Sequence, residues 1–317
     1  MSAIAYVWQL GESLLAIALA PLFAGWIAQC RAWFQSRSAP PLWQPYRTVR
    51  KLFHKDAAMA TNASWLFRAV PYGVFATMVV AAAIIPSVTT ELPLARVADA
   101  IALVGMFATG RVFISLAAMD VGTAFGSLGA RREMMVGFLT EPALLMVLFN
   151  AFLMFGSTAL PKVVEGTLMQ PRIVLYPSLA FAGVAFVMVM LAENARLPID
   201  NPGTHLELTM IHEAMVLEYS ARHLALIEWA SWLKLFNYAC IGFALFVPWG
   251  IAVHGADPLR LAGAIGILLL KLLVAGAALA LLETISAKLR LFRAPEFLTM
   301  AFLLAVLGLL VHLLLEA

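Results

Sequence analysis

Residues 260–284 read RLAGAIGILLLKLLVAGAALALLET, and this stretch decides the fold class. A helix of this length is roughly 37 Å long, enough to cross a hydrocarbon core of about 30 Å. A lone strand would leave its backbone groups unpaired in lipid, so a spanning segment of this kind is helical. The stretch therefore predicts a membrane-spanning helix.

Seven further stretches have the same apolar character. They are residues 11–30, 69–89, 98–119, 142–160, 175–193, 232–253 and 296–316. The whole chain is 63% hydrophobic and 12% charged, whereas soluble domains are about 25% charged. The sequence predicts an all-α, polytopic transmembrane bundle of about eight helices, forming a single integral membrane domain over residues 1–317.

The basic residues predict how the bundle is oriented. Of the 21 Lys and Arg residues, 14 fall in segments 31–68, 119–141, 194–231 and 285–295, and only Arg96, Lys162, Arg172 and Arg260 fall in the connections between them. Cytoplasmic loops carry the excess of Lys and Arg. Both termini are therefore predicted outside, with the long loops on the inner face. The net charge of +3 reflects this asymmetry and gives no reason to expect nucleic acid.

The first inner loop contains an amphipathic helical pattern at residues 45–55. Tyr46, Val49 and Phe53 share one face, and basic residues occupy the others. Such a helix lies at the membrane interface, either as an anchor to lipid headgroups or as a docking rim for a cytoplasmic partner. The predicted docking residues on the inner face are Arg47, Arg50, Lys51, Arg131, Arg290 and Arg293.

The segment 191–228, LAENARLPIDNPGTHLELTMIHEAMVLEYSARHLALIE, concentrates acidic residues among apolar ones. Its carboxylates are Glu193, Asp200, Glu207, Glu213, Glu218 and Glu228. A charge inside a bilayer costs about 2.5–3.5 kcal/mol on insertion scales, so such groups face a protein interior or a wet cavity. Neighbouring carboxylates there do not all ionise, and a row of them can pass protons along. Pro198 and Pro202 predict a broken turn, followed by a helix over about 205–228.

Further ionisable residues lie at or near the ends of the predicted spans. Asp120, Glu141 and Lys234 extend the predicted proton pathway, and Arg111 lies inside the third span. Each of them, taken alone, is equally well explained as part of a satisfied interhelical ion pair. Together they predict a polar route on the inner half of the membrane.

Metal and catalytic chemistry find little support among the residues. His205, Glu207, His212 and Glu213 are conceivable metal ligands, but Val216 stands where a zinc-protease motif needs its second His. The sequence contains no Gly-rich phosphate loop and no nucleophile elbow. We therefore assign this chain no catalytic residue, cofactor or metal.

Four motifs carry a family resemblance. They are AENARLPIDN and LEYS within 191–220, GSLGARREMMVGFLTEPALL at 126–145, APPLWQPYRTVRKLFHK at 39–55 and KLRLFRAPEFL at 288–298. The chain resembles the subunit-1 (H-type) membrane protein of respiratory complex I. The family includes the homologous membrane subunit of energy-converting NiFe-hydrogenases such as formate hydrogenlyase, and the last two motifs and SLGARRE look more like that branch.

The resemblance implies a function and a site. It implies a membrane anchor and proton-conducting coupling subunit of a group 4 type membrane-bound hydrogenase complex in the inner membrane of a bacterium. The implied coupling site comprises Glu141, Glu193, Arg196, Asp200, Glu207 and Glu218, with Arg132 as the cationic counterpart. The implied partners are hydrophilic large and small hydrogenase subunits, an iron-sulfur subunit and antiporter-like membrane subunits. The NiFe centre and iron-sulfur clusters are expected in those partners.

Other functions remain open from the sequence. One is the quinone-site subunit of a complex I-type NADH:quinone oxidoreductase. Another is an autonomous secondary ion transporter, which predicts inverted repeats, and a third is a passive anchor whose acidic residues tolerate neutralisation. The conducted ion is either proton or sodium.

Overall fold

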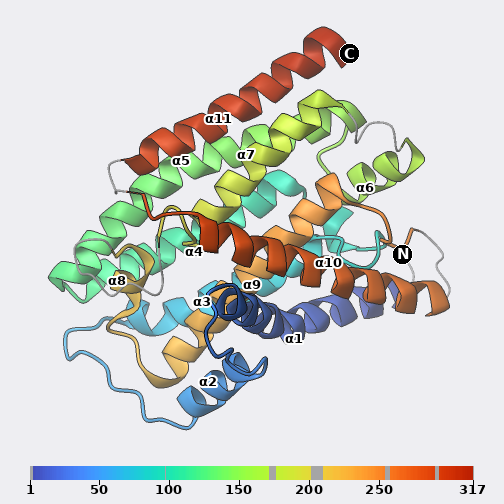
Figure 1. Ribbon diagram of the computed structural model, residues 1–317. Helices are drawn as coiled ribbons and strands as arrows, with labels where there is room; N and C mark the ends of the chain where they lie inside the picture. Colours follow the sequence, from blue (N-terminus) through green and yellow to red (C-terminus); the bar gives the residue numbers. More distant parts are fainter. Residues whose placement is uncertain are drawn as a thin grey trace.

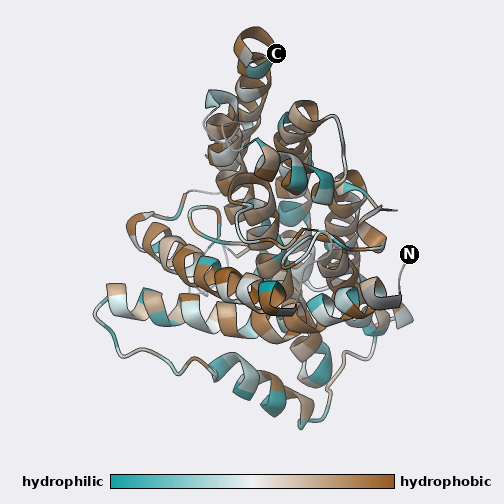
Figure 2. Cartoon of the chain, turned by 90° about the vertical axis from the view of Figure 1, so that its right-hand side faces the viewer, coloured by the Kyte–Doolittle hydropathy of each residue, from teal (hydrophilic) through white to brown (hydrophobic). Residues whose placement is uncertain are grey.

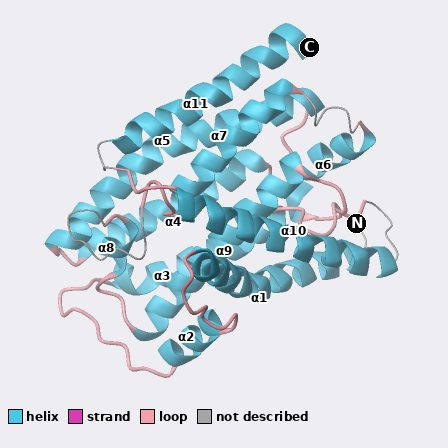
Figure 3. Cartoon of the chain, in the orientation of Figure 1, coloured by secondary structure: helices cyan, strands magenta, loops and turns pink. Residues whose placement is uncertain are grey.

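The computed structural model describes residues 3–96, 98–170, 176–200, 210–253, 258–289 and 293–316. Eight long helices make up most of it: α1 (Ala3–Phe34), α3 (Trp65–Ile84), α4 (Ala100–Asp120), α5 (Ala124–Phe155), α7 (Pro177–Glu193), α9 (Ala221–Phe246), α10 (Pro258–Ile285) and α11 (Ala294–Val311). Shorter helices are α2 (Gln44–Phe53), α6 (Leu160–Met169) and α8 (His212–Val216), with a short helical turn at Leu94–Arg96 and another at His312–Glu316. Figure 3 shows helices joined by loops, without a strand in the described part of the chain.

Local sequence signals explain where several helices begin. Ser64, Asp99 and Thr123 cap α3, α4 and α5, each accepting a backbone N–H from the first turn through its side-chain oxygen. Such caps satisfy donors that have no partner within the helix. Helices α7 and α11 instead begin with Pro in the first turn, where its missing N–H is harmless.

The long helices pack in two groups that share an apolar core. Helix α11 lies beside α7 and α5, whereas α1 lies beside α10 and α9 (Figure 1). Helices α3 and α4 connect the groups, since α4 packs on both α3 and α5 while α3 also packs on α9. The ion-bearing parts of α4, α5, α7 and α9 are thereby brought together.

Six described helices are long and apolar enough to cross a membrane, by length and composition: α1, α3, α4, α5, α10 and α11. Helix α7 is apolar but has 17 residues, and α9 contains Arg222, Glu228 and Lys234. Apolar colour dominates the long helices, while hydrophilic residues gather on α2 at the bottom of the view (Figure 2). The prediction of an all-helical membrane protein is confirmed. Each predicted stretch overlaps one long helix, but the number of spans and the side of the termini stay predictions.

Two predicted boundaries differ from those of the observed helices. The sequence predicts residues 124–141 as part of an inner connection, but α5 begins at Ala124 and runs through Pro142. The sequence predicts an apolar stretch that begins at residue 232, yet α9 begins at Ala221 and contains both Glu228 and Lys234. Charged residues by themselves indicate helix ends, whereas partners on neighbouring helices allow these helices to continue.

The predicted helix over 205–228 is also wrong in its described part. Helix α8 stops at Val216, and α9 begins at Ala221, whose φ of +50° is in the left-handed region. The Tyr219 ring between them stacks on Phe67 at a centroid distance of 3.9 Å, and its hydroxyl donates to the Phe67 carbonyl at 3.1 Å. These contacts fasten the α8–α9 connection to α3 and outweigh helix continuation.

Glycines let α5 approach its neighbours closely. A Cβ on Gly126 would meet the Ala118 carbonyl oxygen of α4 at 2.6 Å, and one on Gly129 would meet Ala214 of α8 at 2.9 Å. The absence of a side chain at these two positions therefore allows α5 to pack closely on α4 and α8. The contact brings α8 against the start of α5, beside the ionisable residues described next.

Candidate functional site

A cavity of about 520 Å³ lies among α1, α3, α4, α8, α9 and the loop after α7. Six residues of the predicted proton pathway line it: Glu193, Arg196, Asp200, Glu213, Glu228 and Lys234. Four ionisable residues that were not assigned to the pathway also line it: Arg31, Arg111, Glu133 and His212. Sequence segments far apart in the chain therefore line one cavity, whose wall combines ionisable and apolar side chains.

Arg111 of α4 is the centre of the ionic cluster beside this cavity. The residue is only 6% exposed. Its guanidinium pairs with Glu141 at 2.7 Å and Glu133 at 3.5 Å, both on α5, and with Glu193 at the end of α7. A buried guanidinium is stable only when ion pairs and hydrogen bonds compensate its lost hydration. Three carboxylates from two helices do so here.

Lys234 of α9 completes this Arg111 cluster. Its ammonium lies 2.9 Å from the Glu193 carboxylate and donates to the Glu193 backbone carbonyl at 2.7 Å. The Thr140 hydroxyl of α5 also donates to the Glu193 carboxylate. Glu193, at 5% exposure, thus receives donors from α4, α5 and α9.

The Arg111 cluster contains three carboxylates and two cations: Glu133, Glu141 and Glu193 against Arg111 and Lys234. With every group ionised it carries one excess negative charge. Low dielectric makes such an excess unfavourable, and binding a proton is the simplest way to remove it. The arrangement is therefore chemically suited to hold and release a proton.

A second cluster has the opposite balance. Glu283 of α10 pairs with Arg196 at 2.9 Å and with Arg31 of α1 at 3.4 Å. Nearby in the chain, Lys288 pairs with Asp200 at 3.1 Å. These pairs attach the loop after α7 to the ends of α1 and α10, so a displacement of that loop would change both.

Several predicted pathway residues lie elsewhere. The Arg132 guanidinium donates to the Met210 carbonyl at 2.8 Å, so Arg111 rather than Arg132 makes the ion pairs with Glu141 and Glu193. Asp120 accepts the Ser64 N–H at 2.9 Å at the start of α3, and Glu218 is exposed. Glu207 lies outside the described residues.

Tyr219 adds a polar link next to Asp120. Burial raises the pKa of the Tyr219 hydroxyl, and the neighbouring Asp120 charge raises this pKa further. The hydroxyl therefore stays protonated and keeps donating to the Phe67 carbonyl. Its contribution is to hold the connection between α8 and α9 in place.

The predicted docking residues are on the surface where they can be described. Arg47, Arg50 and Lys51 of α2, with Arg131 and Arg293, are exposed, whereas Arg290 lies outside the described residues. Helix α2 is held to the bundle by the buried Val49 and by Tyr46, whose hydroxyl donates to the Ala18 carbonyl of α1. The third residue of the predicted apolar face, Phe53, is 47% exposed.

Sequence reasoning noted Glu133, Glu283 and Arg111 as ionisable residues in or beside predicted spans but assigned none of them to the pathway. The available signal was one cation inside an apolar stretch, since an intramembrane Arg requires partners. Which carboxylates supply them depends on helix packing. The four conceivable metal ligands are not tested together, because His205 and Glu207 lie outside the described residues.

Another buried carboxylate, Glu12 of α1, is far in sequence from the clusters described above. It is 5% exposed and accepts the Thr89 N–H at 2.7 Å, the Ser87 hydroxyl at 2.9 Å and the Ser87 N–H at 3.3 Å. Within the described part of the chain, the ion pairs do not include Glu12. It therefore ties α1 to the loop after α3 through neutral donors.

The fold and this site define a polytopic helical membrane protein with a cluster of ion pairs beside an internal cavity. A family model described as NADH dehydrogenase matches residues 10–314, and the chain belongs to this family. The predicted family resemblance is thereby confirmed.

Two relatives from Escherichia coli (strain K12) are similar over most of the chain. Formate hydrogenlyase subunit 4 is 32% identical over 291 residues, covering 92% of this chain and 93% of that protein. Hydrogenase-4 component C is 33% identical over 246 residues, covering 78% of this chain and 76% of that protein. The hydrogenase branch indicated by the motifs is therefore the one in which these relatives lie.

A solved structure shares the fold. A chain of the membrane-bound sulfane sulfur reductase, an archaeal respiratory membrane complex, superposes with a TM-score of 0.79, covering 96% of this chain and 98% of that one. Its sequence identity is 18%, so the likeness concerns the helical arrangement alone.

Proposed function

We propose that this chain is the membrane anchor and proton-conducting coupling subunit of a group 4 type, formate hydrogenlyase-like NiFe-hydrogenase complex. Two hydrogenase relatives support the assignment to this kind of complex. The observation that carries the coupling role is the excess of one carboxylate in the Arg111 cluster, whose central pair of Arg111 and Glu193 is buried.

The mechanism follows from electrostatics in a low-dielectric interior. Electron transfer in a docked redox arm changes the charge near the inner face. Charges separated by poorly screening protein interact strongly, so that change alters how readily the Arg111 cluster holds its proton. A proton taken up from one side and released toward another then converts redox energy into ion movement.

The proposed partners are hydrophilic large and small hydrogenase subunits, an iron-sulfur subunit and antiporter-like membrane subunits. The NiFe centre and iron-sulfur clusters belong to those partners in this proposal. Exposed basic residues on α2 and at Arg131 and Arg293 supply a surface on which an acidic partner could dock. The complex would lie in the inner membrane of a bacterium.

The test compares Glu193→Gln with Glu12→Gln in the intact complex. Both residues are 5% exposed, so the same chemical change is made at the same burial in two different surroundings. Glu193→Gln removes the carboxylate shared by Arg111 and Lys234. We expect it to lower the number of protons translocated per electron at least tenfold while hydrogenase turnover continues, whereas Glu12→Gln keeps the wild-type ratio.

Proton uptake into sealed vesicles, measured together with hydrogen turnover, gives that ratio. A Glu193→Gln complex that is fully assembled and pumps at the wild-type ratio would contradict the coupling role. Loss of pumping in both variants, together with a strongly lowered thermal midpoint of both complexes, would make general destabilisation the cause.

A quinone-site subunit is the second candidate, because the chain belongs to the family described as NADH dehydrogenase and contains a 520 Å³ cavity. Purification of the tagged subunit with its native partners separates the two functions. Nickel and hydrogen oxidation in the purified complex support the hydrogenase assignment. Quinone-dependent activity without nickel supports the second candidate.

A further inference from the structure

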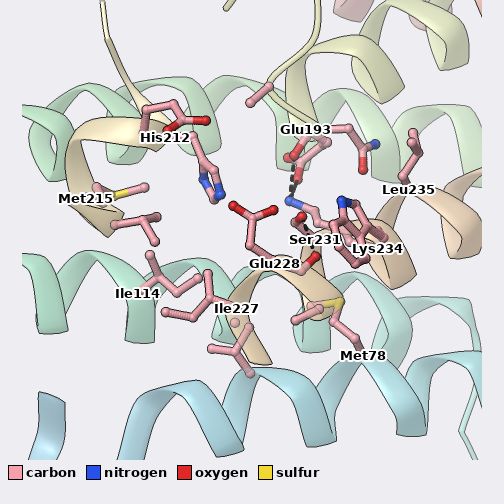
Figure 4. A pocket seen from close by; sticks show the side chains of 18 of the residues that line it. Met78, Ile114, Glu193, His212, Met215, Ile227, Glu228, Ser231, Lys234 and Leu235 are labelled. Atoms are coloured by element: carbon pink, nitrogen blue, oxygen red, sulfur yellow. Dashed lines mark hydrogen bonds and ion pairs between the residues drawn. The ribbon is translucent and has the colours of Figure 1, made fainter. Parts of the chain in front are cut away.

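The side chains of His212 and Glu228 face each other inside the cavity (Figure 4). Both side chains line the cavity, one from α8 and the other from α9. Figure 4 shows the imidazole and the carboxylate pointing toward one another. Glu228 interacts electrostatically with His212 and with Glu213. A base and an acid that face each other in a cavity are a natural pair for proton exchange.

Glu228 is the first of a line of polar residues along α9. Ser231 and Lys234 follow at intervals of three, which places the three residues on successive turns. The Ser231 hydroxyl donates to the Glu228 carbonyl at 2.8 Å, and Lys234 reaches Glu193. The line therefore runs from the cavity wall to the Arg111 cluster.

His212 is held from its backbone. Its N–H donates to the Asp200 carboxylate at 3.3 Å, and Lys288 pairs with the other oxygen of that carboxylate at 3.1 Å. The loop after α7 thus fixes the start of α8. These two interactions do not involve the imidazole ring, which faces the cavity.

Further charged groups line the same cavity around this pair. They are Glu213 on α8, Arg31 on α1, Arg111 on α4, Glu133 on α5, Glu193 on α7, Lys234 on α9, and Arg196 and Asp200 in the loop after α7, with Lys288 paired to Asp200. The Glu228 carboxylate faces the His212 ring (Figure 4). A carboxylate that faces an imidazole can accept a proton from it, because a histidine ring both binds and gives up protons in general acid–base chemistry.

We propose that His212 is the proton-exchanging group at the cavity wall, taking a proton from water on the inner side and giving it to Glu228. This inference rests on the proposed coupling function. In the step, an N–H bond of the imidazolium breaks and an O–H bond forms on the carboxylate. Neutral imidazole and a neutral carboxylic acid result, and release of that proton toward the Arg111 cluster regenerates the carboxylate.

The first experiment compares His212→Gln with His223→Gln in the intact complex. His223 is the matched control because it is buried on α9 with its ring edge-on to Tyr72, and it does not line the cavity. Translocation is measured over a range of pH values in each variant and in the wild type. We expect His212→Gln to lower the rate at least fivefold and flatten its pH profile, with His223→Gln keeping the wild-type profile.

Chemical rescue distinguishes proton transfer from a structural role. His212→Ala leaves space beside the cavity, and added imidazole supplies the missing base. We expect millimolar imidazole to restore translocation in His212→Ala and to leave the wild type and Glu193→Gln unchanged. A merely structural His212 would show no such rescue.

Two failures are distinguishable. Wild-type rates and pH profile in His212→Gln, together with lost pumping in Glu193→Gln, would overturn the role of His212 alone. Normal pumping in Glu193→Gln would overturn the proposed function on which it rests.

Discussion

Glu193 and Glu12 are equally buried carboxylates that the protein stabilises in different ways. Glu193 pairs with Arg111 and Lys234 within a cluster that has one carboxylate in excess. Glu12 accepts one hydroxyl and two backbone N–H groups from Ser87 and Thr89. The first site joins four helices, and the second joins a helix to a loop.

The difference in partners distinguishes a site that can exchange protons from one that only holds two parts of the structure together. In the Arg111 cluster several groups share charge, so protonation of one changes the interactions of all. At Glu12 the donors are fixed by local backbone, and a change of protonation alters only a local contact. Burial of an acidic side chain in a membrane protein is therefore insufficient evidence for ion conduction. The groups that the carboxylate pairs with indicate whether it can take part.

The largest expected effect is that of Arg111→Gln. The substitution leaves three carboxylates with Lys234 as the remaining cation of the cluster. Breaking a buried pair by removing one partner costs about 3–5 kcal/mol. We expect the subunit to be largely lost from the membrane, as measured by immunoblot of purified membranes against wild type.

An Arg111→Gln subunit present at the wild-type level, and as heat-resistant as wild type, would mean that the cluster is hydrated more than its burial indicates. Arg132→Gln is the matched control, because its guanidinium donates to a backbone carbonyl. We expect Arg132→Gln to reduce the amount of subunit in the membrane less than Arg111→Gln does.

Gly137→Ala should have a smaller effect on the same cluster. A Cβ at Gly137 would overlap the Arg111 side chain, whose Nη1, Cζ and Cδ atoms lie against this glycine. Forcing extra atoms into a packed interior typically costs about 1–3 kcal/mol. We expect a lower thermal midpoint of the purified complex and a reduced proton-to-electron ratio.

Gly105→Ala controls for the substitution itself. Gly105 lies on α4, and a Cβ at this position would point into open space. Replacing Gly by Ala within a helix is favourable by about 0.5–1 kcal/mol. Equal behaviour of the two variants would show that displacement of the guanidinium is tolerated.

Hydropathy made the long helices predictable because it is a local property. All eight apolar stretches overlap observed helices, and the capping residues Ser64 and Asp99 are visible in the sequence. The start of α5 was missed since Arg131 and Glu133 resemble loop residues until Arg111 is placed beside α5. The break before Ala221 depends on Tyr219 packing against α3.

The site was predictable in composition and not in pairing. The acidic segment identified Glu193 and Glu228 as candidates, and both line the cavity. Glu133, by contrast, joins Arg111 only through the packing of α4 on α5. Glu12 drew no attention because it is a single acid in an apolar stretch, and its partners lie 75 and 77 residues away.

The smallest expected effect is on stability in Glu12→Gln. One oxygen of the side chain still accepts a hydrogen bond from the Thr89 or Ser87 N–H, but the new amide presents a donor where a donor already lies. A buried donor without an acceptor lowers the free energy of unfolding by about 1–3 kcal/mol. Rotation of the new amide toward another acceptor keeps this loss near the lower value. We expect the thermal midpoint of the complex to fall by a few degrees while pumping is retained. Ser87→Ala removes only the hydroxyl donor. We expect it to lower the thermal midpoint less than Glu12→Gln does and to pump normally. If Glu12→Gln lost pumping at unchanged stability, Glu12 would belong to the ion route. The distinction between Glu193, which exchanges protons, and Glu12, which only holds α1 to the loop after α3, would then be wrong for Glu12.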